Sequence, residues 1–406
     1  MSNNTQPEIR FPGFMEDWEQ RKLSDEMTDF IVPMRDKPKE FGGNIPWTRI
    51  EDIEGKFLND SLSEQYVTEE TIQKMNLKII PKDSLIVSSS ATFGVVAVVT
   101  QNLITNQTFI GLVPREKNTL DYWYSFFQSS EARKYMKLQS AGSTIFYIAR
   151  DSFEKMPISV PKIDEMIKIG EYFSNLDNLI TLHHRKLDLL KETKKGFLQK
   201  MFPKNGAKVP EIRFPGFTED WEQRRLSDVA SIVGGGTPST SNPEYWDGDI
   251  DWYAPAEIGD QIYVSKSLKT ITELGQQKSS AKILPIGTVL FTSRAGIGNT
   301  AILAKEGTTN QGFQSIVPHK NKLDSYFIFS RTHELKRYGE VTGAGSTFAE
   351  VSGKQMAKMP ILIPCINEQR KIGAFFEQLD TTITLHQREL DVLKETKKGF
   401  LQKMFV

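Results

Sequence analysis

The sequence is poor in the features that mark several classes of protein. It has one cysteine, Cys365, so no disulfide can form within the chain, and a reducing cytoplasm is the expected compartment. We expect Cys365, which follows the apolar run MPILIP, to be a small buried residue rather than a nucleophile. The first ten residues lack the basic and apolar regions of a secretory signal, and no apolar run is long enough to span a membrane.

An excess of charge of either sign is also lacking. Lys and Arg together number 51, and so do Asp and Glu, so the net charge of zero argues neither for nor against a nucleic-acid partner. The hydrophobic content of 38% is ordinary for a globular protein, and 406 residues favour two or three domains. Only local clusters of charge can therefore point to a partner.

Catalytic signatures are missing as well. The sequence contains no GxxxxGK[ST] loop, no dinucleotide fingerprint and none of the motifs HExxH, CxxC or GxSxG. Glu54 and Lys56, with Asp36 upstream, faintly match a nuclease triad, but the second half of the chain does not repeat them. We therefore predict that the chain has no catalytic apparatus of its own.

What the chain does contain is a repeat of half its length. The segment PEIRFPGFMEDWEQRKLSD (7–25) returns as PEIRFPGFTEDWEQRRLSD (210–228), with 17 of 19 positions equal. A second pair, 176–202 and 379–405, has 22 of 27 positions equal at the same offset of 203 residues. A period this long indicates duplication of whole domains rather than a solenoid.

Two diverged segments lie between these constant pieces. We place the boundaries at 1–27, 28–160 and 161–202 in the first repeat, and at 203–230, 231–363 and 364–406 in the second. In each repeat the middle segment is a variable domain, the first is a constant N-terminal segment, and the last is a constant helix. Because drift alone would alter all segments alike, the near-identity of the constant pieces indicates identical partners or recombination through them.

The constant helices carry a heptad pattern. In the second repeat, apolar or seam residues recur at steps of four and three from Ile372 to Met404, and the first repeat matches; only Lys194 and Lys397 interrupt the stripe. Pro161 and Pro364 precede the helices. The pattern predicts two helices of nearly forty residues that pair as an antiparallel coiled coil under a pseudo-twofold.

Two polar features of these helices leave alternatives open. His183 and His386 lie in the predicted seam, where a residue that fixes the register is favoured over a metal ligand. The basic runs KETKKGFLQK (191–200 and 394–403) suit a solvated face, with DNA phosphates or an acidic partner as the alternative.

The variable domains are predicted to be α+β globules on a strongly bent sheet. Short β-like runs such as SLIVSSS and GTVLFTS alternate with turn signals, and one helix is expected near residues 120–138 and another near 325–339. Their loops are rich in donor and acceptor side chains, which suit base edges and phosphates. The predicted DNA-contacting residues are Arg35, Lys37, Thr92, Asn106 and Gln107 in the first domain, and Thr237, Ser239, Arg294, Asn310 and Gln311 in the second.

Two of these assignments have structural alternatives. The TNQ triplets that contain Asn106 and Asn310 could cap a turn inside the fold instead. Arg294 could form a surface ion pair.

The whole chain resembles the specificity subunits of type I restriction–modification systems. The resemblance is carried by the twin FPGF–EDWEQ–LSD segments, by the paired helices ending in KKGFLQKMF, and by the GST–MP–P pattern at the end of each domain. GGGTPS and TSRAGIG in the second half are also typical of that family's target-recognition domains, whereas the first domain has SSSATFG and lacks GGGTPS. The fold expected is two similar α+β target-recognition domains separated by two long antiparallel coiled-coil helices.

The resemblance implies that this chain recognises DNA and that its partner subunits catalyse the reactions. Each variable domain would read one half of a bipartite double-stranded DNA site, and the helices would set the spacing. The constant segments would dock two modification subunits, with Trp18, Phe197, Trp221 and Phe400 as candidate contacts. S-adenosylmethionine for adenine N6 methylation, and ATP with Mg²⁺ on two restriction subunits, would belong to those partners; no cofactor or metal is expected in this chain. The rival hypotheses are a protein-binding coiled-coil adaptor and a stand-alone methyltransferase or nuclease.

Overall fold

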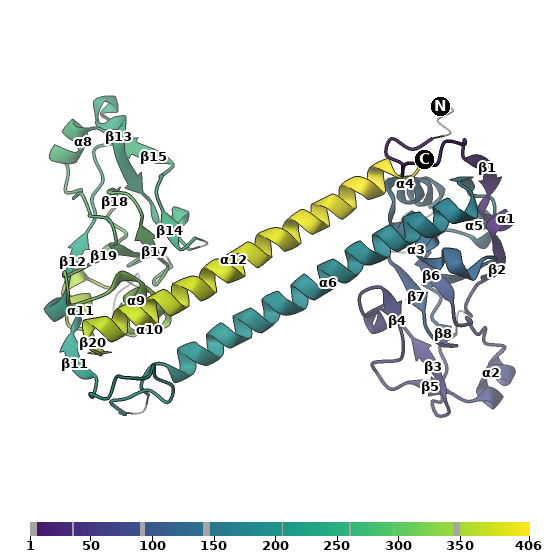
Figure 1. Cartoon of the computed structure of the whole chain (residues 1–406), viewed down its shortest axis with the longest axis horizontal. Coiled ribbons are helices and arrows are strands. Elements are labelled where there is room, and N and C mark those ends of the chain that lie inside the picture. The colour runs from purple at the N-terminus through teal and green to yellow at the C-terminus, as the bar shows by residue number, and fades with distance from the viewer. Residues whose placement is uncertain are drawn as a thin grey trace. The chain divides into compact units, whose positions relative to one another are not determined.

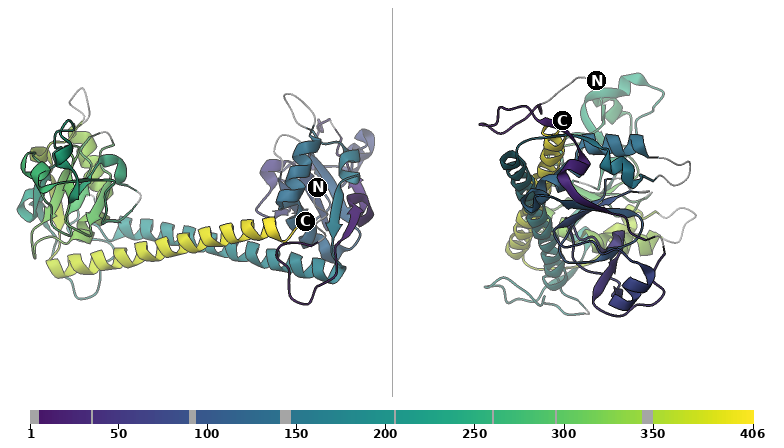
Figure 2. Two further views of the ribbon diagram at one scale, coloured as in Figure 1. Left: turned by 90° about the horizontal axis from the view of Figure 1, so that it is seen from above. Right: turned by 90° about the vertical axis from the view of Figure 1, so that its right-hand side faces the viewer.

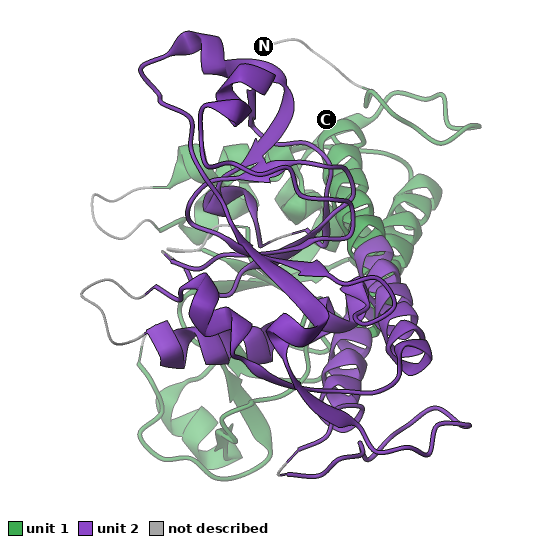
Figure 3. Ribbon diagram, turned by 90° about the vertical axis from the view of Figure 1, so that its left-hand side faces the viewer, with its two compact units in different colours: residues 1–186, 387–406 green, residues 187–386 purple. Residues whose placement is uncertain are grey.

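The computed structural model describes residues 6–34, 36–89, 94–140, 147–204, 206–259, 261–294, 296–343 and 350–406. The chain forms two compact units (Figures 1 and 3). Unit 1 comprises Met1–Lys186 and Gln387–Val406, and unit 2 comprises Leu187–His386. The units do not coincide with the sequence repeats, because each combines the variable domain of one repeat with the end of the other repeat's helix.

The variable domain of unit 1 has two sheets. A five-stranded sheet has the order β2-β9-β6-β7-β4, and a three-stranded sheet has the order β5-β3-β8. These strands are β2 (Met27–Ile31), β3 (Ile45–Thr48), β4 (Phe57–Leu58), β5 (Tyr66–Val67), β6 (Ser84–Ser88), β7 (Val96–Val99), β8 (Ile104–Thr105) and β9 (Phe109–Pro114). The central strand β6 is buried along its whole length, as its run of apolar residues predicts.

Unit 2 repeats this arrangement strand for strand. Its sheets have the orders β12-β19-β16-β17-β14 and β15-β13-β18. The strands are β12 (Ala230–Gly234), β13 (Trp246–Tyr253), β14 (Tyr263–Val264), β15 (Lys269–Ile271), β16 (Val289–Phe291), β17 (Thr300–Leu303), β18 (Thr308–Thr309) and β19 (Gln314–Pro318). The prediction of a single bent sheet is therefore wrong in detail, since each domain divides its strands between two sheets.

A short antiparallel ribbon joins the constant N-terminal segment to the end of each variable domain. β1 (Glu19–Lys22) pairs with β10 (Pro157–Val160), and β11 (Glu222–Arg225) pairs with β20 (Pro360–Ile363). The sequence pairs these segments only indirectly, because a residue separation of about 140 leaves no local signal.

The helix predicted after the last long strand of each domain is present but broken into two. In unit 1, α3 (Leu120–Gln128) ends at Ser129, whose extended backbone and side-chain oxygen cap α4 (Ser130–Gln139). In unit 2, Arg331 separates α9 (Ser325–Ser330) from α10 (Thr332–Gly343). The remaining short helices are α1 (Leu23–Glu26), α2 (Glu69–Met75), α5 (Arg150–Glu154), α7 (Leu226–Val229), α8 (Glu273–Gln277) and α11 (Gly353–Ala357).

The two long helices have the predicted length. They are α6 (Ile163–Lys200) and α12 (Ile366–Lys403), 38 residues each, and they begin two residues after Pro161 and Pro364. In unit 1 the first part of α6 runs antiparallel to the last part of α12 (Figures 1 and 2). Both helices share a hydrophobic core with α3. The α+β fold with two long helices is thus confirmed.

The residues that follow each long helix pack into the core of the unit that contains the other repeat's variable domain. In unit 1, Phe405 stacks on Phe173 of α6, with ring centroids 5.9 Å apart. In unit 2, Phe202 stacks on Phe376 of α12 at the same 5.9 Å. Ile9 N–H also donates to Lys403 O in unit 1 at 3.0 Å, which ties the constant N-terminal segment to the end of α12.

The structure corrects the expectation for the cysteine. Cys365 is exposed, because it lies one residue before α12 begins, outside the apolar strand β20 that precedes it. Among the residues that the structure describes, no helix is both long and apolar enough to cross a membrane.

Candidate nucleic-acid interface

Three predicted DNA-contacting residues of unit 1 meet around one cavity. Lys37, Asn106 and Gln107, which lie about 70 residues apart in sequence, line a hollow of about 230 Å³. Trp47, the third residue of β3, lines it as well and is 5% exposed. Residues from two distant loops are therefore brought together over a buried tryptophan.

Cations lie over two aromatic rings here, Trp47 of this cavity and Phe41 of a neighbouring hollow. Lys37 Nζ lies 5.3 Å from the centroid of the Trp47 ring and 5.6 Å from that of Phe41, and the Arg49 guanidinium lies 5.6 Å from Trp47. Such contacts hold a cation near a ring without neutralising it, which suits a phosphate-contacting group. The neighbouring hollow of about 820 Å³ is mixed in charge, with Lys37, Lys39, Lys74, Asp36, Glu40 and Glu70 among its lining residues.

The two predicted asparagines serve as turn caps. Asn106 Oδ1 accepts from Thr108 N at 3.3 Å and from Thr108 Oγ1. Asn310 Oδ1 accepts from Gly312 N at 2.7 Å in the corresponding turn of unit 2. These bonds match the structural alternative for the TNQ triplets, in which the asparagine shapes the turn and positions its neighbours.

The neighbour so positioned is a glutamine in both domains. Gln107 and Gln311 are exposed at the turn between β8 and β9 and at the turn between β18 and β19. Gln311 Oε1 accepts a hydrogen bond from Thr237 Oγ1, so two predicted DNA-contacting residues of unit 2 touch each other. Ser239 lies on the same loop, where its Oγ bonds to Ser241 Oγ at 2.8 Å.

The last two glycines of the triplet before Thr237, Gly235 and Gly236, have a steric reason. A Cβ atom on Gly235 would lie 1.9 Å from Asn310 O, and one on Gly236 would lie 2.2 Å from Ser280 Oγ. Gly236 O also accepts from the indole nitrogen of Trp252 at 2.8 Å. These two glycines therefore let the Thr237 loop lie directly against the glutamine turn.

Trp47 and Trp252 are functional candidates that sequence reasoning missed. Trp47 pairs with Ile104 in β8, and Trp252 pairs with Thr308 in β18, so each lies beside the strand that leads into its glutamine turn. The signal was available in the sequence, since a tryptophan follows each of the runs NIP and DID, but without the sheet register nothing links it to the turn.

Arg294 forms an ion pair, but a long one. Its Nη1 lies 3.9 Å from Glu350 Oε2, and the two side chains are 37% and 42% exposed. The surface ion pair that was the alternative for Arg294 is therefore present, and an exposed pair at this distance is weak. Two further predicted residues, Arg35 and Thr92, lie outside the described residues.

The predicted partner-binding residues divide into two kinds. Trp18 and Trp221 are 2% exposed and belong to the cores of their units, so the direct partner contact predicted for them does not fit their burial. Phe197 and Phe400 are half-buried and pack against those cores. Periodicity and composition could not separate these two kinds, because aromatic residues serve both in a core and at a partner interface.

The constant N-terminal segments each form the same buried ion pair with a long helix. Arg10 Nε and Nη2 both bind the carboxylate of Glu165 at 2.7 Å, and Arg213 binds Glu368 in the same way at 2.7 and 2.8 Å. Both glutamates are 1% exposed. The hydrogen bond to Glu165 raises the pKa of Arg10. These bidentate pairs fasten each constant segment to the start of its own helix.

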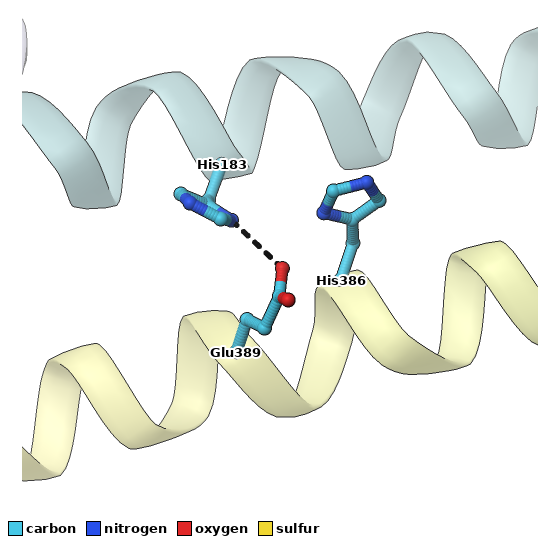
Figure 4. Close-up of side chains that lie close together, drawn as sticks. All are labelled: His183, His386 and Glu389. Carbon is cyan, nitrogen blue, oxygen red and sulfur yellow. Dashed lines mark ion pairs between the residues drawn. The ribbon is translucent and has the colours of Figure 1, made fainter.

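The predicted seam histidine of unit 1 makes a polar contact. His183 Nδ1 lies 3.5 Å from Glu389 Oε2 (Figure 4). The contact joins the α6 and α12 segments of unit 1, as a polar residue that helps to set helix register would.

Comparisons with known proteins agree with the duplicated architecture. The family model for the type I restriction modification DNA specificity domain matches twice, at residues 15–192 and 218–395. The MjaIX specificity subunit of Methanocaldococcus jannaschii is 34% identical over 191 residues, 46% of this chain and 44% of that protein. The putative MjaX specificity subunit of the same organism is 25% identical over 404 residues, 95% of this chain and 92% of that protein.

A solved structure extends the likeness to the fold of the whole chain. The S subunit of the type I restriction–modification system from M. genitalium superimposes with a TM-score of 0.63 at 14% identity, covering 99% of each chain. The two family matches together span most of the 406 residues. The chain therefore belongs to the family of type I restriction–modification DNA specificity subunits.

Proposed function

We propose that each α+β domain reads one half of a split, asymmetric DNA site, and that the two long helices set the distance between the half-sites. One observation carries this proposal: the same turn, held by a capping asparagine, presents an exposed glutamine in both domains, Gln107 and Gln311. The framework of the turn is shared, while the segments around it differ. That is the arrangement needed by two readers of unrelated half-sites.

The chemistry of these residues fits direct readout. A glutamine amide pairs with N6 and N7 of adenine in the major groove, and each such contact is worth about 1–3 kcal/mol of discrimination. Lys37 and Arg49, held over Trp47, supply cations for the phosphates beside the bases. In unit 2 the hydrogen bond between Thr237 and Gln311 fixes the side chain that would read.

The helices suit a spacing element. Each is an uninterrupted helix of 38 residues, about 57 Å long. If the two DNA-reading domains are separated by part of that length, they would contact the duplex about one helical turn apart, which is about 34–36 Å. The proposal therefore includes a non-specific gap between the two half-sites.

The partners of the complex carry the chemistry. Two modification subunits would dock on the constant segments, one per repeat, and bring S-adenosylmethionine to flip and methylate an adenine in each half-site. Two restriction subunits would supply ATP-driven translocation and cleavage in the cytoplasm. The half-buried Phe197 and Phe400 remain candidate contacts for the modification subunits. In this proposal the chain itself recognises DNA and catalyses nothing.

The test is sequencing of methylated adenines in a host with and without the gene, with the cognate modification subunit expressed. We expect a bipartite N6-methyladenine motif that appears only with the gene. If no such motif appears while the modification subunit is active with another specificity subunit, the proposal fails. A binding titration of the purified complex complements this test, because DNA affinity must fall steeply as salt rises.

A further inference from the structure

The first residues of the two long helices differ between the repeats far more than the rest. Between 162–175 and 365–378, 6 of 14 positions are identical, whereas 22 of 27 are identical between 176–202 and 379–405. The predicted boundaries assign all of these residues to the constant helices.

Two of the six identical positions contact constant parts of the chain in both units. Glu368 forms the bidentate ion pair with Arg213, and Lys371 Nζ lies over the rings of Phe214 and Phe217 at 5.5 and 5.7 Å. In unit 1, Glu165 pairs with Arg10 and Lys168 lies over Phe11 and Phe14 at 5.5 and 5.6 Å, so the same contacts recur.

The largest difference lies at a buried position. Gln369 is 1% exposed; its Oε1 accepts from Asp324 N, and its Nε2 donates to Lys322 O, both at 3.1 Å. The equivalent residue in unit 1 is Met166, which is 2% exposed and part of the hydrophobic core. An amide that holds a polar loop thus stands where the other repeat has an apolar side chain.

A second difference fastens the edge strand of the five-stranded sheet to the helix. In unit 2, the Tyr263 hydroxyl at the start of β14 donates to Glu377 Oε1. In unit 1, the equivalent of Glu377 is Ser174, whose Oγ accepts from Lys56 Nζ at 3.0 Å, just before β4. The same helix position therefore binds the edge strand or the residue before it in both repeats, through a carboxylate in unit 2 and through a hydroxyl in unit 1.

A third difference adds to the same face of α12. Arg370 Nη2 donates to Asn321 Oδ1 at 3.0 Å, and the equivalent of Arg370 in unit 1 is Ile167. Burial and the hydrogen bond to Glu377 raise the pKa of Tyr263 above its ordinary value. Gln369, Arg370 and Glu377 form what we call the matching face of α12.

From these contacts we infer that the start of each long helix, together with the residue before it (162–175 and 365–378), is matched to its own variable domain and positions that domain on the helices. The recognition module that retains its fit on exchange is accordingly 26–175 or 229–378, rather than 28–160 or 231–363. The nearly identical block starts at Leu176 and Leu379, so recombination within that block transfers the matching face together with its domain. The inference rests on the proposed function only where it concerns DNA reading.

A comparison of two full-length chimaeras tests the inference. The narrow exchange replaces residues 231–363 by 28–160, and the wide exchange replaces 229–378 by 26–175. In the narrow chimaera Gln369 lies where the incoming domain packs a methionine in a hydrophobic core, so its buried amide is placed among apolar side chains. We expect the narrow chimaera to unfold at a Tm several degrees below that of the wide one. We also expect it to bind more weakly than the wide one to DNA that carries two copies of the first half-site.

Equal Tm values and equal DNA affinities for the two chimaeras would overturn the inference. If neither binds DNA but the wide chimaera still unfolds at the higher Tm, the proposed function fails while the matching holds. The two failures are thus distinguishable.

Point variants keep the test independent of chimaera folding. The triple change Gln369→Met, Arg370→Ile and Glu377→Ser gives α12 the residues of the first repeat at the matching face. The control, Ala374→Glu with Gln378→Asn, does the same at two exposed positions. We expect a Tm loss of about 4 °C or more for the triple variant and none for the control. A triple variant as stable as the control would contradict the inference.

Discussion

Lys397 Nζ lies 2.6 Å from Asp177 Oδ1, and the two side chains are only 14% and 18% exposed. Lys397 also donates to Gln128 Oε1 of α3 at 2.8 Å. In unit 2, Lys194 and Asp380 repeat the ion pair at 2.5 Å. The two lysines that interrupt the heptad stripe are therefore seam residues with a partner, and they hold one helix end against the start of the other within each unit.

Removal of one member of this pair should destabilise unit 1. We expect Lys397→Met to lower the free energy of unfolding by about 1–3 kcal/mol, because it leaves the Asp177 carboxylate half-buried without its cation. The double variant Lys397→Met with Asp177→Leu should recover most of that loss. Chemical denaturation of the full chain measures both.

The neighbouring lysine provides the control. Lys398 forms an exposed pair with Glu395, with side chains 65% and 73% exposed. Lys398→Met should change the free energy of unfolding by less than about 0.5 kcal/mol. Equal effects of the changes at 397 and 398 would show that the seam pair has no special role.

Glycines in the same helices should respond in opposite ways to alanine. A Cβ on Gly170 would lie 2.7 Å from Tyr122 N, and one on Gly373 would lie 2.5 Å from Asp324 Oδ1, whereas one on Gly196 meets nothing within 4 Å. We expect Gly170→Ala to lower the Tm, since the helix would be pushed away from α3. Gly196→Ala should stabilise by about 0.5–1 kcal/mol through helix propensity. A stabilised Gly170→Ala protein, measured by calorimetry, would refute the close approach.

The stability of unit 2 should depend on acid through Asp251. Burial opposes ionisation of this carboxyl, but hydrogen bonds from Lys305 and Ser267 outweigh burial and lower its pKa. A lowered pKa in the folded state means that the stabilisation is fully present above the unfolded value, about 3.9, and is lost as the pH falls through the folded value.

Asp251→Asn should therefore unfold more easily than the wild-type chain at pH 7, and the difference in free energy should shrink as the pH falls below about 4. Urea titrations at a series of pH values measure this difference. A constant difference across the series would mean that the charge of Asp251 contributes nothing.

Arg294 should affect one half-site only. We expect Arg294→Ala, in the assembled complex, to relax discrimination at one position of one half-site by about 1–3 kcal/mol and to leave the other half-site unchanged. Arg225→Ala removes an exposed arginine from β11 and serves as the control. Competition binding with substituted duplexes provides the measurement, and unaltered recognition of both half-sites would remove Arg294 from the predicted readers.

The sequence suggests many of the candidate loop residues, but it does not show which of them contact one another. The TNQ triplets can be recognised as turns from the sequence, because loop composition is a local property. That Asn106 and Asn310 cap those turns while Gln107 and Gln311 point outward depends on backbone geometry. The contact between Thr237 and Gln311 joins loops 74 residues apart and has no local signature.

The sequence by itself determined the duplication, the two long helices and their proline boundaries, because identity at an offset of 203 residues and a heptad stripe are both readable along the chain. Only the tertiary structure decided what each stripe packs against. A periodic pattern specifies an apolar face but not its partner. The stacking of Phe405 on Phe173, the burial of Trp18 and the pairing of Lys397 with Asp177 arise from long-range packing between segments that the sequence keeps far apart.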